Sequence, residues 1–326
     1  MSGGGNVDAA TLRPVARVLV TRHLPDGGLD PLDGHEIVQR DDDRPFTHDE
    51  LVAAVPGFDA VVCLLTDRID AKVIDAGAGR LKVIGNVAVG FDNVDVTAAT
   101  AHGVAVCNTP GVLDETTADL ALALMLAASR LLSEAERDIR AGRWEGWGID
   151  QYLGRDVHGA TLGLVGYGRI GRAVARRAAG FDMRVLHHAR RDTGAPGYVA
   201  DLDALVAEAD VVSLHVPLSA ETRHLFDARR LAQMKPTAVL VNTSRGPVVD
   251  EEALATALED GTIFAAGLDV YEHEPDVLPR LLAAPRTVLL PHVGSASVAT
   301  RTRMARVAAE GVRAVLAGER PTNLVT

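Results

Sequence analysis

An apolar run that ends in a glycine-rich turn, followed by a helical pattern, is the feature that most constrains how this chain can fold. The run TLGLVG leads into Gly166-Tyr167-Gly168-Arg169-Ile170-Gly171, and the helical pattern continues as RAVARRAAG. The first glycine permits a tight turn, the second lets backbone approach a pyrophosphate, and the third allows close packing of helix and strand. The start of the helix offers unpaired N–H groups to phosphates. The pattern predicts a dinucleotide site at Gly166, Gly168 and Gly171.

Strand-like and helix-like segments alternate on both sides of this turn. Such alternation is typical of parallel sheets with right-handed crossovers. From residue 15 the expected strands are VARVLVT, DAVVCLL, LKVIGN and VAVCN, with helices in THDELVAAV, IDAKVIDAGA and VDVTAATAHG. After the turn they are TLGLVG, MRVLHH, DVVSLHV, TAVLVNT, IFAAGLDV and TVLLPHV, with helices in DLDALVAEA, ARRLAQM and DEEALATALED. The expected cofactor sheet is therefore complete with six strands.

The first alternation breaks at Thr109-Pro110-Gly111, where a turn precedes a long Ala/Leu helix near residues 113–132 and an irregular connection over 141–160. We predict an α/β fold of two doubly wound parallel-sheet domains, Rossmann-like and flavodoxin-like, with a cleft between them. Residues 112–295 would bind NAD(P). A last helix, 296–316, would return to the first domain, so that residues 1–111 plus 296–326 form the substrate domain.

Composition excludes several classes of partner. The formal charge of −11 over 326 residues argues against nucleic acid and anionic membranes, which need a basic face. The N-terminal MSGGGNVDAATLRP reads as a loose tail without an export signal, and a cytoplasmic location is expected. Cys63 and Cys107 are expected as core residues of a reducing compartment rather than a disulfide or a metal pair. The apolar segment 118–128 is too short to cross a bilayer and is expected to be a buried helix.

The segment after the second strand of the cofactor sheet bears on the choice of nicotinamide. An NAD-binding unit usually carries an acid there for the ribose 2′-hydroxyl, whereas this chain has His187-His188-Ala189-Arg190-Arg191. The guanidiniums of Arg190 and Arg191 could pair with a 2′-phosphate, which favours NADP(H). Alternatively they are two solvated loop arginines, and NAD(H) stays possible.

Three polar residues each follow an expected strand: Arg245 in LVNTSRGPVVD, Glu274 in DVYEHEP and His292 in LLPHVGSA. A guanidinium can orient a carboxylate by bidentate pairing. An imidazole exchanges protons near neutral pH, and a carboxylate beside it fixes its tautomer. Each residue alone could be structural, but together they predict a site that binds a 2-oxo or 2-hydroxy acid and moves a proton.

The motifs VGYGRIG, HVPLSAETRHL, LVNTSRGPVVDEEAL, AAGLDVYEHEP and LPHVGSAS resemble the D-isomer-specific 2-hydroxyacid dehydrogenase family over nearly the whole chain. The glyoxylate/hydroxypyruvate reductases within it are the most similar. The resemblance implies that Arg245, Glu274 and His292 are catalytic. It also implies that the backbone amides of Val89 and Gly90 help Arg245 hold the acid, and that Leu65 lines the same pocket.

The resemblance further implies a set of cofactor contacts and an oligomer. A homodimer is expected, in which Trp147, with Trp144 nearby, matches a loop tryptophan that reaches the partner's site in some relatives. The expected cofactor contacts, with the fingerprint glycines, are Thr117, Gly166, Gly168, Arg169, Ile170, Gly171, Arg190, Arg191, Val216, Pro217, Thr222, Thr243, Ser244, Asp269, His292 and Gly294.

The expected reaction is reduction of a small 2-oxo acid to the D-2-hydroxy acid by hydride transfer. His292, supported by Glu274, would protonate the carbonyl oxygen while Arg245 clamps the carboxylate. Three alternatives within the family are a phosphoglycerate, a 2-ketogluconate and a phosphite dehydrogenase. A cofactor-sensing binding protein, similar to corepressors that resemble this family, is the alternative from another class.

Overall fold

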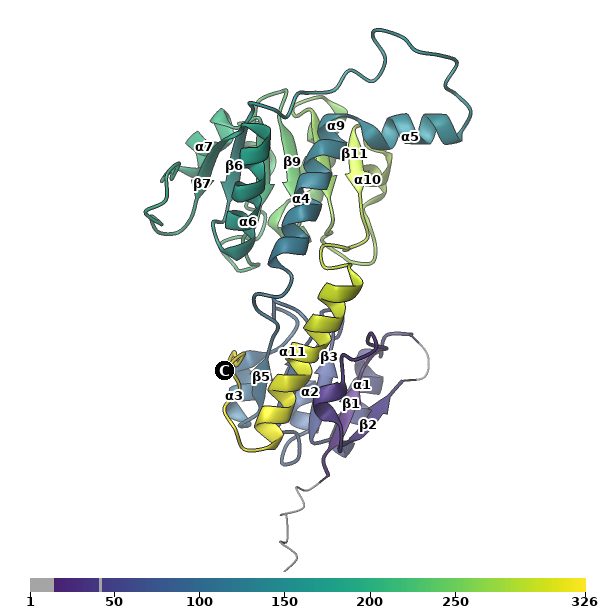
Figure 1. Cartoon of the computed structure of the whole chain (residues 1–326), viewed down its shortest axis with the longest axis vertical. Helices are drawn as coiled ribbons and strands as arrows, with labels where there is room; N and C mark the ends of the chain where they lie inside the picture. The colour runs from purple at the N-terminus through teal and green to yellow at the C-terminus, as the bar shows by residue number, and fades with distance from the viewer. Residues whose placement is uncertain (1–14, 41–42) are drawn as a thin grey trace, which may run out of the picture. The chain divides into compact units, whose positions relative to one another are not determined.

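The computed structural model describes residues 15–40 and 43–326 (Figure 1). The expected loose N-terminal tail lies outside the described residues. The chain folds into two compact units. Unit 1 comprises the described part of Met1–Val112 together with Ser297–Thr326, and unit 2 is Leu113–Ala296. Each unit contains one sheet in which all strands are parallel, so the predicted α/β class is confirmed.

Unit 1 contains a five-stranded sheet in the order β2-β1-β3-β4-β5. Its strands are β1 Arg17–Val20, β2 Glu36–Gln39, β3 Ala60–Cys63, β4 Val83–Asn86 and β5 Ala105–Cys107. Its helices are η1 Asp30–Leu32, α1 His48–Ala54, η2 Val55–Gly57, α2 Ala71–Ala76, α3 Val96–Ala101 and α11 Val298–Leu316. Helices α1 to α3 pack on one face over a core that includes Ile74, Ile84 and Val106.

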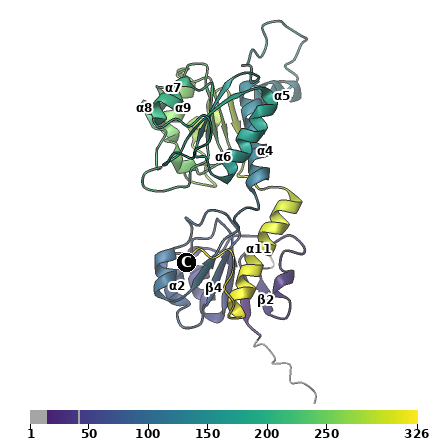
Figure 2. The same ribbon diagram turned by 60° about the vertical axis from the view of Figure 1, so that its left-hand side comes forward.

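Helix α11 covers the other face of this sheet through small residues (Figure 2). A Cβ on Gly85 of β4 would lie 2.7 Å from the Val312 side chain, so backbone and helix approach closely. Ala305, Ala308 and Ala309 of the helix are fully buried. Beyond α11 the chain pairs with β5, where the Val325 N–H donates to the Val106 carbonyl at 2.7 Å. The C-terminal segment therefore belongs to the same sheet edge.

Unit 2 contains a six-stranded sheet in the order β11-β10-β9-β8-β6-β7, the number of strands that the sequence predicted. Two cores lie on its two faces, one under α4 and α6 and the other under α7, α8 and α9 (Figure 2). The strands are β6 Thr161–Val165, β7 Arg184–His188, β8 Val211–Leu214, β9 Val239–Asn242, β10 Ala265–Leu268 and β11 Thr287–Leu289. The helices are α4 Asp114–Ser129, α5 Leu132–Arg140, α6 Arg169–Ala178, η3 Ala179–Phe181, α7 Leu202–Glu208, α8 Ala228–Leu231, η4 Gly246–Val248, α9 Glu251–Glu259 and α10 Pro279–Ala283.

Several boundaries differ from the predictions. The long helix expected near 113–132 ends at Ser129, because Leu131 adopts a left-handed φ of 53°, and α5 begins after it. Strand β2 was not predicted, since it is a half-buried strand that pairs with β1 at the edge of the described sheet. Helix α10 was also missed. The helix expected in ARRLAQM is reduced to α8, and α11 begins at Val298 because the Ser297 hydroxyl caps it.

The predictions for the apolar helix and the cysteines are confirmed by burial. Ala118, Leu124 and Ala128 of α4 are buried, as are the free thiols of Cys63 and Cys107. Within residues 15–40 and 43–326, no single helix has the length and apolarity to cross a membrane. The consecutive helices α4 and α5 reach that length and apolarity only when they are counted together, across the bend of 69° between them.

Candidate active site

The residues predicted to bind cofactor and acid in unit 2 follow the strands of one parallel sheet. The carboxyl ends of parallel strands meet at one edge, where ligands bind in folds of this kind. Gly166 follows β6, Arg190 follows β7, Val216 and Pro217 follow β8, Thr243 to Arg245 follow β9, Asp269 and Glu274 follow β10, and His292 to Gly294 follow β11. The topology therefore brings to one edge groups that are up to 128 residues apart in the sequence, from Gly166 to Gly294.

The glycine-rich turn has the geometry expected of a phosphate cradle. Gly166 has a φ of 99°, and a Cβ there would lie 2.5 Å from the His215 carbonyl oxygen. Gly171 packs directly on the Gly166 carbonyl. Gly168 caps α6, and an added Cβ would have no described atom within 4 Å, so the space above it is open. Among the described residues the buried Thr243 hydroxyl also has no hydrogen-bond partner. These features fit a dinucleotide.

The loops after β7 and β8 flank this turn. The His187 ring stacks on Tyr167 of the turn with centroids 3.7 Å apart, and its Nε2 lies 2.8 Å from the Thr193 hydroxyl. Arg190 and Arg191 are exposed. In the loop after β8, the Thr222 hydroxyl donates to the Pro217 carbonyl at 2.7 Å. Thr222 therefore shapes the loop that the resemblance places against the cofactor.

His292 and Glu274 form the hydrogen-bonded pair that the sequence predicted to move a proton. His292 Nδ1 lies 2.7 Å from Glu274 Oε2, and both side chains are about three-quarters buried. The other carboxylate oxygen accepts the Tyr271 N–H at 3.0 Å. Burial raises the pKa of Glu274, but the hydrogen bond and charge of His292 outweigh it, so the pKa is lowered overall. The carboxylate thus stays ionised and leaves Nε2 as the ring nitrogen available to a ligand.

Asp269 supports the unusual backbone of His292, which has a left-handed φ of 53°. The buried Asp269 carboxylate accepts the N–H groups of Val293 at 2.7 Å and Gly294 at 2.8 Å. Thr117 on α4 donates its hydroxyl to the Gly294 carbonyl at 3.2 Å. Desolvation raises the pKa of Asp269 despite these bonds. Asp269 and Thr117 therefore hold the loop that presents the imidazole.

Asn242 and Gly246 position Arg245, and neither was singled out in the sequence. The buried Asn242 amide donates to the Arg245 carbonyl at 3.0 Å and accepts the Ser244 N–H at 3.0 Å. A Cβ on Gly246 would overlap the Tyr271 carbonyl and the Glu272 nitrogen. The loop of Arg245 is therefore packed backbone to backbone against the loop that leads to Glu274. The pair Gly246-Pro247 was the only sequence signal of this contact.

We expect Gly246→Ala to lower the free energy of unfolding by at least about 1–3 kcal/mol, because overpacking forces backbone apart. We expect kcat to fall by a larger fraction than the free energy of unfolding. The reason is that the displaced backbone carries Arg245 in one loop and leads to Glu274 in the other. Urea unfolding and kcat measure the two effects. Gly180→Ala is the matched control, because a Cβ at Gly180 meets no described atom within 4 Å. If Gly246→Ala and Gly180→Ala had the same free energy of unfolding and the same kcat, the close packing of Gly246 on the Tyr271–Glu272 backbone would be contradicted.

The lowered pKa of Glu274 also predicts a pH effect on stability. An acid whose pKa is lower in the folded state adds stability above its ordinary pKa of about 4.5, and that stability is lost as the pH falls through the folded value. We therefore expect wild type to be more stable than Glu274→Gln at pH 7, with the gap closing below pH 4.5. Thermal unfolding of both proteins between pH 7 and 3 measures this. A gap that widens toward acid would show that the carboxylate is not stabilised in the fold.

In unit 1, amide side chains hold the two loops predicted to meet the acid. Asn86, which is fully buried, donates to the Gly90 carbonyl at 2.9 Å. Asn93 donates to the Leu64 carbonyl at 3.1 Å, next to the half-buried Leu65. Asn108 donates to the Val89 carbonyl at 2.8 Å. These contacts leave the N–H groups of Val89 and Gly90 on a braced loop.

Comparison with known proteins identifies the family. The profile of the "D-isomer specific 2-hydroxyacid dehydrogenase, NAD binding domain" matches residues 122–294. A glyoxylate reductase from Korarchaeum cryptofilum is 49% identical over 320 residues, which cover 95% of each chain. One from Thermococcus onnurineus is 45% identical over 321 residues, again 95% of each chain.

Solved structures agree. A protein from Thermus thermophilus has a TM-score of 0.89 at 48% identity, covering 95% of this chain and 100% of that one. An NADPH-dependent glyoxylate/hydroxypyruvate reductase from Sinorhizobium meliloti, in complex with NADP and malonate, has a TM-score of 0.84 at 36% identity, covering 96% and 97%. The chain belongs to the D-isomer-specific 2-hydroxyacid dehydrogenase family. It is an oxidoreductase with an NAD(P)-binding domain, and the resemblance noted in the sequence is confirmed.

Proposed function

We propose that this enzyme reduces glyoxylate and hydroxypyruvate to the corresponding 2-hydroxy acids, the D isomer in the case of hydroxypyruvate. The observation that carries the proposal is the 2.7 Å pair of His292 and Glu274 at the same sheet edge as the Arg245 loop. Relatives at 41–49% identity over 95% of the chain are named glyoxylate reductases, which supports the substrate class. Unit 2 binds the cofactor in this proposal.

Arg245, His292 and Glu274 have different roles in this mechanism. Arg245, helped by the backbone N–H groups of Val89 and Gly90, holds the substrate carboxylate and polarises the adjacent carbonyl. His292 donates a proton from Nε2 to the carbonyl oxygen as that oxygen gains negative charge. Glu274 keeps the imidazole oriented through its hydrogen bond to Nδ1. The nicotinamide cofactor, when bound on the glycine turn, supplies the hydride to C2.

The remaining predicted residues line the cofactor and substrate positions in this proposal. Leu65 contacts the substrate. Asp269 and Thr117 hold the loop of His292, and Thr117 also lies near the nicotinamide in this proposal. Cofactor contacts come from Gly166, Gly168, Arg169, Ile170, Gly171, Val216, Pro217, Thr222, Thr243, Ser244, Asp269, His292 and Gly294.

A panel of 2-oxo acids tests the proposed substrate class. Initial rates with glyoxylate, hydroxypyruvate, 3-phosphohydroxypyruvate and 2-ketogluconate, each with NADPH and with NADH, should be highest for the first two acids. Phosphite with NAD⁺ tests the remaining alternative in the family. A higher rate with another member of the panel would move the enzyme to that activity. Cofactor binding without turnover of any acid would indicate a cofactor-sensing protein instead.

NADP(H) is the preferred coenzyme in this proposal, because Arg190 and Arg191 follow β7 where an acid would select NAD(H). Exposed guanidiniums at this position fit a 2′-phosphate. Replacing both by serine should raise KM for NADPH about 10- to 100-fold, since a hydrogen bond to a charged group contributes about 1.5–3 kcal/mol. KM for NADH should change little. Steady-state kinetics with both coenzymes decide this. An unchanged KM for NADPH would make the two arginines solvated loop residues, and equal rises in both KM values would show that they do not select the 2′-phosphate.

The enzyme is a homodimer in this proposal. Helix α5 and the segment after it expose several large apolar side chains: Leu132, Ile139, Trp144, Trp147, Ile149 and Leu153. Several large apolar side chains exposed along one segment are typical of an interface. Sedimentation equilibrium should therefore give twice the chain mass of 34.4 kDa.

Trp147 is 80% exposed within the chain and reaches the partner's substrate in this proposal, so Trp147→Ala should raise KM for the acid.

A further inference from the structure

Two carboxylates outside the proposed catalytic set hold each other's backbone in unit 2. The Glu251 N–H donates to Glu272 Oε1 at 3.1 Å, and the Glu272 N–H donates to Glu251 Oε1 at 2.7 Å. Glu251 starts α9, and Glu272 lies in the loop after β10, two residues before Glu274. The reciprocal bonds therefore join the first turn of α9 to the loop that carries the partner of His292. We call this pair the glutamate clamp.

The clamp also reaches the loop after β8. Glu272 Oε2 lies 3.0 Å from His224 Nε2, and the His224 N–H donates to the Pro247 carbonyl at 2.8 Å. His224 has a left-handed φ of 49° and stands two residues after Thr222. Through His224, the clamp thus connects three loops at the carboxyl edge of the sheet. These are the loops that carry Thr222, Arg245 and Glu274.

Burial makes this arrangement sensitive to the loss of either partner. Glu251 is 7% exposed, and desolvation raises its pKa, while the Glu272 side chain is 13% exposed. Removing one partner of a buried hydrogen-bonded pair leaves the other group unsatisfied, which costs more than the bond itself contributes. Gly246 also packs directly against the Tyr271 carbonyl and the Glu272 nitrogen of the same loop. The loop before Glu274 is therefore held both by the clamp and by the Gly246 backbone.

We propose that Glu251 and Glu272 are positioning residues for proton transfer, because they hold the loop in which Glu274 meets His292. The inference rests on the proposed function. The Tyr271 N–H donates to Glu274 Oε1 at 3.0 Å, so the segment that the clamp fixes also orients the Glu274 carboxylate. Displacement of that segment moves Glu274 relative to His292. A misplacement of about 1 Å can cost about 100-fold in rate.

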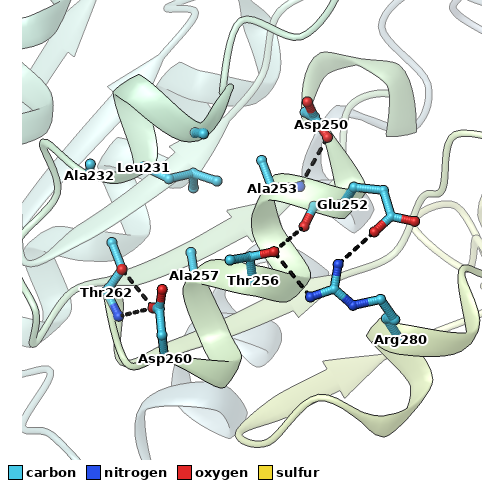
Figure 3. A pocket seen from close by; sticks show the side chains of 11 residues that line it. Leu231, Ala232, Asp250, Glu252, Ala253, Thr256, Ala257, Asp260, Thr262 and Arg280 are labelled. Atoms are coloured by element: carbon cyan, nitrogen blue, oxygen red, sulfur yellow. Dashed lines mark hydrogen bonds and ion pairs between the residues drawn. The ribbon is translucent and has the colours of Figure 1, made fainter.

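Glu252 provides a matched control on the same helix turn. It carries the same charge as Glu251, but its carboxylate is exposed and pairs with Arg280 at 2.7 Å (Figure 3). There it lines a hollow of about 320 Å³ between α8 and α9. Exposed ion pairs of this kind contribute about 0–1 kcal/mol. Glu252→Ala therefore removes the same number of atoms and the same charge without touching the clamp.

The test compares Glu251→Ala with Glu252→Ala by two readouts. In the cofactor-free protein, amide hydrogen exchange over residues 270–274 should accelerate in Glu251→Ala and match wild type in Glu252→Ala. With glyoxylate and NADPH, kcat should fall about 10- to 100-fold in Glu251→Ala with a smaller change in KM. Glu252→Ala should stay within about twofold. Glu272→Gln, which keeps an acceptor for the Glu251 N–H and a polar group at His224, should retain most of kcat.

Wild-type exchange and wild-type kcat in Glu251→Ala would overturn the proposal, as would an equal loss in Glu252→Ala. If Glu251→Ala does not fold, Glu251→Asp answers the same question, because it keeps the charge and withdraws the carboxylate by one methylene. Hydrogen exchange needs no turnover, so the clamp is tested even if wild type reduces no 2-oxo acid. A wild-type protein that reduces no 2-oxo acid would refute the proposed function, and the clamp would then be only a structural contact.

Discussion

Replacing His292 by alanine is expected to lower kcat for glyoxylate about 10²- to 10⁴-fold, the usual contribution of a general acid. NADPH affinity should change far less, because the proposed site for the phosphates is the glycine turn after β6. Stopped-flow turnover and a fluorescence titration of NADPH measure the two effects separately. The loss arises because the imidazole that Glu274 orients at 2.7 Å is the proposed proton donor to the carbonyl oxygen.

His158→Ala is the control for this experiment, since His158 is an exposed histidine of the same unit. It should behave as wild type. If His292→Ala with cofactor bound kept a near-normal kcat, another group would have to supply the proton. The roles given to His292 and Glu274 would then be wrong.

The second large effect is expected at Arg245. Removing one partner of a desolvated, hydrogen-bonded charge pair costs about 2–5 kcal/mol, so Arg245→Gln should lower kcat/KM for glyoxylate by at least about 30-fold. Arg245→Lys should recover only part of this, because an ammonium keeps the charge but cannot form the bidentate pair. Steady-state kinetics with both variants measure the difference.

Arg229→Lys is the matched substitution away from the site, because Arg229 is an exposed partner of Asp203 at 2.7 Å. It should leave kcat/KM unchanged. Full activity in Arg245→Lys would mean that charge alone holds the substrate carboxylate. Full activity in Arg245→Gln would remove Arg245 from substrate binding.

The sequence predicted the parts of the fold that local patterns specify. The glycine turn and the six strands of unit 2 follow from alternation and from Gly166, Gly168 and Gly171. Site residues at strand ends could also be predicted from the sequence, because parallel strands bring their carboxyl ends to one edge. For this reason the sequence could predict the pairing of His292 with Glu274, which lie 2.7 Å apart.

Contacts between loops could not be predicted in the same way. Asn242 and Gly246 matter through backbone groups of segments that are distant in sequence, and no periodicity reports such contacts. Glu251 and Glu252 are adjacent acids in a first helical turn, where negative charge is expected for either. Only the folded chain shows that one contacts Glu272 and the other Arg280. Edge strand β2 was missed because its half-buried residues give a weak pattern.

The most direct test of the central claim is the chirality and stoichiometry of the product formed from hydroxypyruvate and NADPH. The account predicts one D-glycerate for each NADPH oxidised, as measured by chiral chromatography alongside absorbance at the nicotinamide band. L-glycerate, or no oxidation of NADPH or NADH in the presence of hydroxypyruvate or glyoxylate, would contradict it.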